Sequence, residues 1–108
     1  MKTGVQIISE ERARHFMQEN WTAKHDDAHA KGELAVAAAC YALTQYEIRR
    51  STVCHHGVPR DRFTTIIDHL WPFEREWWKP TPRNRVKQLA KAGALIAAEI
   101  DRLQRLKP

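Results

Sequence analysis

Apolar residues recur at intervals of three and four along most of the chain, which is the spacing of one face of an α-helix. The first segment with this pattern begins at Ser9, whose hydroxyl can cap a helix, and Glu10 and Glu11 would then lie in its positive first turn. The apolar positions of this helix are Ala13, Phe16 and Met17. We expect the helix to end near Asn20.

A second and more apolar helix is predicted to begin between Asp26 and Glu33 and to end near Arg49. Its apolar positions keep the same spacing, and Ala37 and Cys40 widen a surface of small side chains. These positions are Leu34, Ala35, Ala38, Ala39, Ala42, Leu43 and Tyr46. Small side chains let two helix axes approach closely, so this face is expected to pack on another helix.

The pattern changes between this helix and the last one. Residues 51–60 mix Ser, Thr, Gly and Pro without periodicity, which predicts a loop. Helical spacing returns from Asp61 to Leu70 and predicts a short helix. Its apolar positions are Phe63, Ile66, Ile67 and Leu70.

The last helix is predicted to begin with Thr81 as its cap and Pro82 in its first turn. Its apolar positions form a stripe, namely Val86, Leu89, Gly93, Ile96, Ile100 and Leu103. This stripe is expected to pack on the alanine face of the second helix, with Gly93 allowing close contact.

These elements predict an all-α fold in which residues 1–108 form a single helical domain. The expected architecture is an antiparallel bundle of three main helices plus one short helix. A chain of 108 residues can build one core but not two. Because that core is thin, we expect oligomerisation to complete the bundle.

The composition is typical of a folded, soluble protein, with 43% hydrophobic and 29% charged residues. Its two cysteines form no spaced framework and follow no secretory signal, which indicates a reducing compartment. No apolar stretch approaches the roughly 18 residues that cross a bilayer. A cytoplasmic protein without a membrane partner is therefore expected.

Positive charge is concentrated at the C-terminal end. The formal net charge is +5, yet residues 79–108 hold eight Lys or Arg and only two acids, Glu99 and Asp101. Such a concentration attracts phosphate or carboxylate groups, which favours an anionic partner. The simpler alternative is a solvated helix face.

Acidic and imidazole side chains gather before the second helix. His25, His29 and Glu33 are spaced four apart, so on one helix they would share a face and suit zinc or iron. Asp26, Asp27 and Glu33 could instead hold Mg²⁺ together with substrate phosphates. The alternative is that an aspartate only caps the helix.

Arg83, Lys87 and Lys91 are also four apart and form a cationic row near the start of the last helix. A helix start beside basic side chains favours phosphate binding. Trp77 and Trp78 directly precede this row, and an indole could stack on a nucleobase. Both tryptophans could equally belong to the core.

Three segments, "ISEERARHFMQENWTAKHDDAHAKGELAVAAACYA", "WPFEREWWKP" and "KAGALIAAEIDRL", resemble a family of short, uncharacterised proteins encoded by phages and prophages. The likeness covers most of the chain, with residues 49–65 as a variable loop or insertion. It implies an infected or lysogenic bacterial cell as the place where the protein acts.

The layout is also remotely similar to MazG-like all-α nucleotide pyrophosphohydrolases, which gather carboxylates around Mg²⁺ to activate water. That likeness implies nucleotide chemistry and a fold completed by partner subunits. Here only Glu33 remains of the first carboxylate run, and Lys87 and Lys91 stand where the second is sought. Lysine neutralises phosphate without a metal, so binding could persist where hydrolysis does not.

The leading hypothesis is a non-enzymatic, oligomeric binder of a phosphorylated nucleotide that needs no cofactor, which the phage likeness suggests is a counter-defence protein sequestering a host signal. One alternative is a MazG-like Mg²⁺-dependent pyrophosphohydrolase with Asp26, Asp27 and Glu33 as ligands. Another is a basic phage adaptor that inhibits a host protein or nucleic-acid complex. The candidate ligand-binding residues are Trp21, Lys24, His25, Asp26, Asp27, His29, Glu33, Trp77, Trp78, Lys79, Arg83, Lys87 and Lys91.

Overall fold

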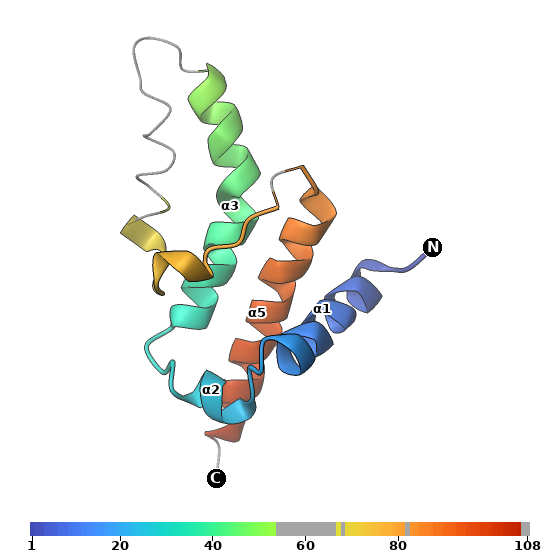
Figure 1. The fold of residues 1–108 in the computed structure, drawn as a ribbon, viewed down its shortest axis with the longest axis vertical. Coiled ribbons are helices and arrows are strands. Elements are labelled where there is room, and N and C mark those ends of the chain that lie inside the picture. Colours follow the sequence, from blue (N-terminus) through green and yellow to red (C-terminus); the bar gives the residue numbers. More distant parts are fainter. Residues whose placement is uncertain (54–66, 68, 82, 107–108) are drawn as a thin grey trace.

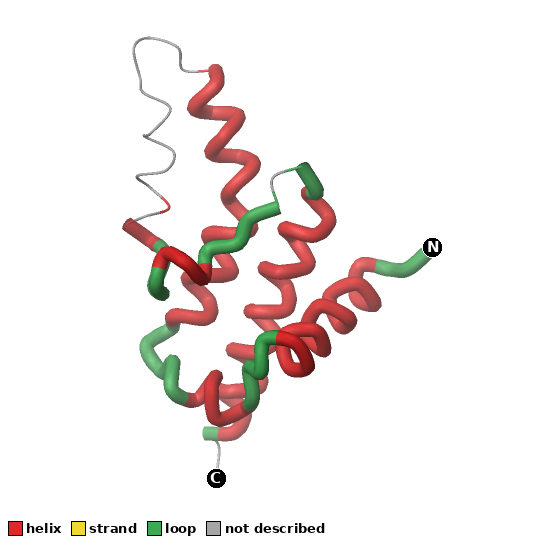
Figure 2. The backbone as a smooth tube through the Cα atoms, viewed as in Figure 1, coloured by secondary structure: helices red, strands yellow, loops and turns green. Residues whose placement is uncertain are grey.

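The computed structural model describes residues 1–53, 67, 69–81 and 83–106, and in α3 it describes side chains as far as residue 43. All regular structure in this part of the chain is helical (Figures 1 and 2). The elements are α1 (Gly4–Gln18), α2 (Ala23–Asp27), α3 (Glu33–Val53), the 3₁₀ turn η1 (Arg75–Trp77) and α5 (Arg85–Arg105). The predicted all-α class, with three main helices and a short one, is confirmed.

Helix α5 is the element on which the others pack. Figure 1 shows α3 beside it and running in the opposite direction, while α1 crosses it and α2 lies near its C-terminal end. Two side chains of α5 secure these contacts: Arg85 donates to the Ala42 carbonyl at 2.8 Å, and Arg105 binds Asp27 at 2.8 Å. No helix in the described part of the chain is long and apolar enough to span a membrane.

Alanines, together with two leucines and a tyrosine, form the contact between α3 and α5. Its buried members are Leu34, Ala37, Ala38, Tyr41, Ala92, Leu95 and Ala98. The buried face of α3 is therefore turned from the predicted one, because Ala35, Ala39 and Leu43 are exposed. Alanine occurs nearly all around this segment, so its sequence does not define one face.

The predicted packing stripe of α5 is wrong. Its large members, Val86, Leu89, Ile96, Ile100 and Leu103, are exposed. The buried side chains of α5 are instead alanines, Leu95 and three long polar residues, Gln88, Lys91 and Arg102. Two helices that meet through alanine approach too closely to hold a row of leucine and isoleucine between them. Gly93 does make the predicted close contact, but with Ile8 of α1.

Helix α1 also departs from its prediction. It starts at Gly4 because Thr3 and Gln6 form a reciprocal capping box, so Ser9 lies within the helix. Its buried side chains are Glu11 and His15, whereas Ala13, Phe16 and Met17 are exposed. The end at Gln18 agrees with the prediction.

Two further boundaries need correction. Asn84 caps α5 through Lys87 N, and the backbone N–H and hydroxyl of Thr81 bond Gln88 Oε1 instead of capping the helix. Residues 51–53 continue α3, so the predicted loop does not start at 51. Residues 67, 69 and 70 are helical, as expected there. The rest of that loop, Tyr46's side chain, Phe63, Ile66 and Pro82 lie outside the described part.

Candidate functional site

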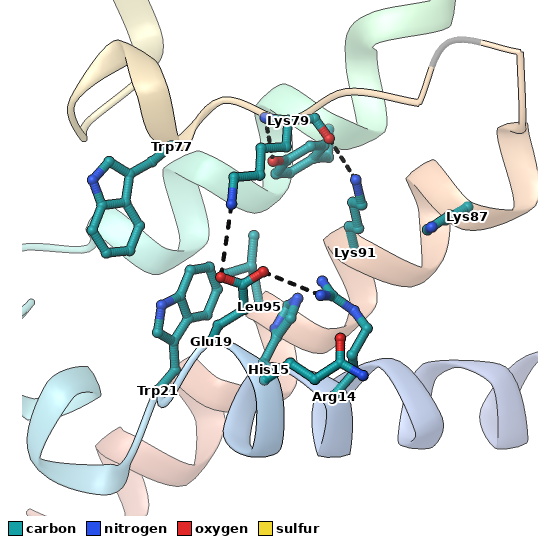
Figure 3. A pocket seen from close by; sticks show the side chains of 11 residues that line it. Arg14, His15, Glu19, Trp21, Trp77, Lys79, Lys87, Lys91 and Leu95 are labelled. Carbon is teal, nitrogen blue, oxygen red and sulfur yellow. Dashed lines mark hydrogen bonds and ion pairs between the residues drawn. The ribbon is translucent and has the colours of Figure 1, made fainter.

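A cavity of about 300 Å³ opens where α1 crosses α5 (Figure 3). We call it the cationic pocket. Its positive side chains come from three separate segments: α1, the stretch after η1, and α5. They are Arg14, Lys79, Lys87 and Lys91. The indoles of Trp21 and Trp77 form part of its wall. The fold thus gathers charges that are distant in sequence.

Lys91 is the most enclosed of these cations. Its ammonium donates to the Lys79 carbonyl and lies 5.5 Å from the centre of the Tyr41 ring. Burial lowers the pKa of Lys91, because removing the charged form from water is unfavourable. The Tyr41 hydroxyl in turn accepts the Lys79 N–H at 3.1 Å. Lys91 and Tyr41 therefore fix the backbone that carries Lys79.

Acidic side chains balance part of this charge. Glu19 accepts from Arg14 Nη1 at 3.1 Å, and its other oxygen lies 3.8 Å from Lys79 Nζ (Figure 3). The Glu11 carboxylate accepts hydrogen bonds from Arg14 Nε at 2.9 Å and from Arg14 Nη2 at 2.7 Å. Burial raises the pKa of Glu11, but hydrogen bonds from Arg14 and His15 outweigh it and bring that pKa to about 2. The Glu19 carboxylate thus occupies a position suited to an anion.

Two buried polar atoms of pocket residues have no hydrogen-bond partner among the described residues: His15 Nδ1 and Trp21 Nε1. The other ring nitrogen of His15 lies 3.0 Å from Glu11 Oε2. A buried polar atom without a partner is costly for a fold, and such atoms often mark functional sites.

A second cavity, of about 410 Å³, shares Trp21 and Trp77 with the first. We call it the aromatic pocket. The Trp21 and His25 rings are parallel within 1° at 5.2 Å, and Trp77 lies at 5.9 Å from Trp21, tilted by 20°. His29 meets Phe73 edge-on at 4.9 Å. These flat faces suit an aromatic ring system.

Seven of the candidate residues are brought together at the two pockets. They are Trp21, His25, His29, Trp77, Lys79, Lys87 and Lys91. Lys24 and Arg83 are exposed and line neither pocket. Trp78 packs on the core, with its ring 4.7 Å from Tyr41, which agrees with the core alternative for that tryptophan.

The acidic candidates are engaged separately. Asp26 is buried and accepts from Arg12 at 3.3 Å, with His25 Nδ1 2.9 Å from its other oxygen. Asp27 pairs with Arg105, and Glu33 accepts the Lys31 N–H. No three His, Cys, Asp or Glu side chains in the described segments form a metal-binding group. Asp26, Asp27 and Glu33 are therefore not gathered into one site in this part of the chain, and neither are His25, His29 and Glu33.

Arg14 and Glu19 are functional candidates that the sequence reasoning missed. Both lie near the end of α1, where Asn20 adopts a left-handed conformation, φ 58°, and turns the chain. This turn brings the Trp21 ring to 4.6 Å from the His15 ring. In the sequence, Asn20 next to a tryptophan is the one signal that indicates this turn. The position of Arg14 among the lysines depends on the crossing of α1 over α5, which the sequence does not reveal.

Comparison of the chain with protein-family models, curated proteins and solved structures finds no match. The chemistry of the two pockets is thus inferred from their residues and geometry.

Proposed function

We propose that this protein binds a phosphorylated, nucleotide-like small molecule, with its phosphate in the cationic pocket and its base in the aromatic pocket. One observation carries the proposal: cations from three segments converge beside two indoles that both pockets share. A nucleotide carries both groups that such a site would bind, because its charged phosphate and its flat base are covalently joined.

The cationic pocket suits a multiply charged group. Lys87 Nζ has no protein partner among the described residues, and Lys91 Nζ uses one of its three N–H groups to donate a hydrogen bond to the Lys79 carbonyl. Lys79 shares Glu19 with Arg14. Hydrogen bonds between such cations and phosphate oxygens are about twice as strong as those between neutral groups. The phosphate is therefore the anchor of the ligand.

The aromatic pocket suits the base. A purine or pyrimidine could lie against Trp21, Trp77 or Phe73, and stacking on an aromatic side chain is worth about 1–3 kcal/mol per base. His25 and His29 offer ring nitrogens at the edge of this surface. Stacking accepts any base, so the histidines are the residues that would discriminate among bases.

These residues favour binding of the nucleotide over its hydrolysis. Asp26 and Asp27 are occupied by Arg12 and Arg105, and the phosphate side of the site is built from lysines. Lysine neutralises phosphate directly as a point charge. A protein that binds a nucleotide without consuming it lowers its free concentration, which is the sequestering, counter-defence role that the phage resemblance implies.

Isothermal titration with a panel of ligands tests the proposal. Nucleoside mono-, di- and triphosphates and cyclic nucleotides should release heat, inorganic phosphate should bind weakly, and unphosphorylated nucleosides should give none. Heat from no member of the panel would refute the proposal. Release of pyrophosphate from a triphosphate with Mg²⁺ would instead favour the hydrolase alternative.

Replacing Glu19 by Gln is expected to tighten nucleotide binding by about 2–5-fold, the size of a partly exposed charge interaction. The change removes an anion that competes with phosphate for Arg14 and Lys79. Glu76→Gln is the matched control, because Glu76 is exposed and lines neither pocket. Equal affinity of both variants and the unmodified protein would exclude Glu19 as a competitor.

A further inference from the structure

Lys91 differs from the other lysines of the cationic pocket because it is buried. It is only 7% exposed, whereas Lys79 and Lys87 are exposed. Its side chain extends from α5 toward the stretch after η1, where the ammonium donates to the Lys79 carbonyl (Figure 3). A buried lysine that is held in this way has a defined position in the cavity, and burial is also what gives lysine amines their chemical reactivity in proteins.

The surroundings of Lys91 favour its uncharged form. Burial is the main reason that the pKa of Lys91 lies below its ordinary value, and the charges of Lys87, Arg14 and Lys79 act in the same direction. Glu11 acts in the opposite direction, but its carboxylate is paired with Arg14. A lysine that is desolvated or lies next to other cations is activated as a nucleophile, and such amines form imines with carbonyl compounds.

The same cavity determines which carbonyl compound can reach this amine. Arg14, Lys79 and Lys87 line it and favour a ligand that carries a phosphate group. The indoles of Trp21 and Trp77 offer flat faces to a ring. The volume of about 300 Å³ lies at the lower end for small-molecule sites, so the compound is small. A small phosphorylated aldehyde fits this combination of charge, shape and reactive amine.

We propose that Lys91 forms an imine with a phosphorylated aldehyde bound in the cationic pocket. The uncharged amine attacks the carbonyl carbon, so that a nitrogen–carbon bond forms and the carbon–oxygen bond breaks. The oxygen leaves as water with the two protons of the amine. The imine nitrogen then takes up the proton that the ammonium had released to solvent, which restores the positive charge. The step needs no oxidant or reductant.

The structure also holds the groups that stabilise the product. The protonated imine retains one N–H, and the Lys79 carbonyl that accepts from the Lys91 ammonium is in place to accept from it. The Tyr41 ring, whose centre lies 5.5 Å from Nζ, remains beside the positive charge. The imine therefore forms without the loss of either contact.

This inference rests on the part of the proposed function that places a phosphate in the cationic pocket, and it does not need the aromatic pocket. The two proposals can fail separately. A chain that releases no heat with any nucleotide but forms the imine supports the inference and refutes nucleotide binding. A chain that binds nucleotides but forms no imine at Lys91 refutes the inference alone.

Reduction with borohydride tests the proposal, with pyridoxal phosphate as the probe aldehyde. Borohydride supplies the hydride that converts the imine to a stable amine, and mass spectrometry of peptides then locates it. At limiting probe, Lys91 should be modified before the exposed Lys24 and Lys31. Pyridoxal, which lacks the phosphate, should modify Lys91 about 10-fold less, the effect of losing one hydrogen bond to a charged group.

Two variants and the map of modified lysines complete the test. Lys91→Met removes the amine and should lose the early modification. Lys24→Met is the matched control, because Lys24 is exposed and lines neither pocket, and it should keep that modification. If Lys91→Met fails to fold by circular dichroism, the map of the unsubstituted chain still decides. Modification spread evenly over the lysines, preference for Lys87, or equal modification by pyridoxal overturns the proposal.

Discussion

Lys87→Glu is expected to weaken nucleotide binding by about 100-fold or more. One hydrogen bond to a charged group is worth about 1.5–3 kcal/mol, and reversal of the charge adds repulsion. A total near 3 kcal/mol corresponds to about a hundredfold change in Kd. Lys87 is exposed and caps no helix, so the variant should keep its fold. Titration with the strongest ligand of the panel measures the change.

Arg83→Glu is the matched control for this variant. Arg83 carries the same charge and precedes the same helix, but it is exposed and lines neither pocket. Arg83→Glu changes only the long-range electrostatic attraction between α5 and the ligand. The affinity should therefore fall about 2–3-fold, and less at high salt. An equal loss for both variants would mean that ligands follow the general positive field of α5. An unchanged affinity of Lys87→Glu would remove Lys87 from the site.

The contrast between these two residues shows what a sequence can predict of a site. Arg83, Lys87 and Lys91 are equivalent in spacing, and the four-residue interval does predict that they share one side. Whether these side chains line a pocket depends on two further points. One is the place where α1 crosses α5, and the other is the start of α5 at Arg85 and not at Thr81. Arg83 thereby falls outside the helix. Local spacing contains no information about either point.

The errors in the fold have a related cause. Periodicity located α3 and α5 well, because each is a long segment with a strong helical pattern. It chose the wrong faces, since α3 has alanine on nearly every side and α5 has both a large apolar stripe and a small one. The rule that large apolar residues face the core fails when two helices pack through alanine. Ile96 and Ile100 are then left exposed, while the contact with α3 buries Ala92 and Ala98.

Helix α1 illustrates the converse case, in which polar residues are buried. Its sequence offers Phe16 and Met17, yet Glu11 and His15 face inward. Their burial is tolerated because Arg14 and the two side chains themselves form a bonded cluster, with Glu11 Oε2 between Arg14 and His15. A cluster of this kind depends on three-dimensional partners, so hydropathy cannot reveal it. Arg14 and His15 of this cluster also line the cationic pocket, where such exceptions to the usual pattern are expected.

Asp26→Ala is expected to lower the free energy of unfolding by about 3 kcal/mol, the range found when one partner of a buried ion pair is removed. Asp26 is 1% exposed and connects α2 to α1 through Arg12, while its other oxygen meets His25. Loss of the carboxylate leaves the His25 ring without this partner beneath Trp21. Urea denaturation followed by circular dichroism measures the change.

Asp27→Ala separates this structural role from metal binding. Asp27 is adjacent in sequence and half-exposed, and its ion pair with Arg105 is open to solvent, so its removal should change stability little. If both aspartates held Mg²⁺, the two variants would lose metal binding alike and neither would unfold more easily. A large loss of stability for Asp26→Ala alone, with nucleotide binding unchanged by Asp27→Ala, requires that the aspartates act separately. Equal stability of the two variants would contradict the assignment of Asp26 as the buried link between α1 and α2.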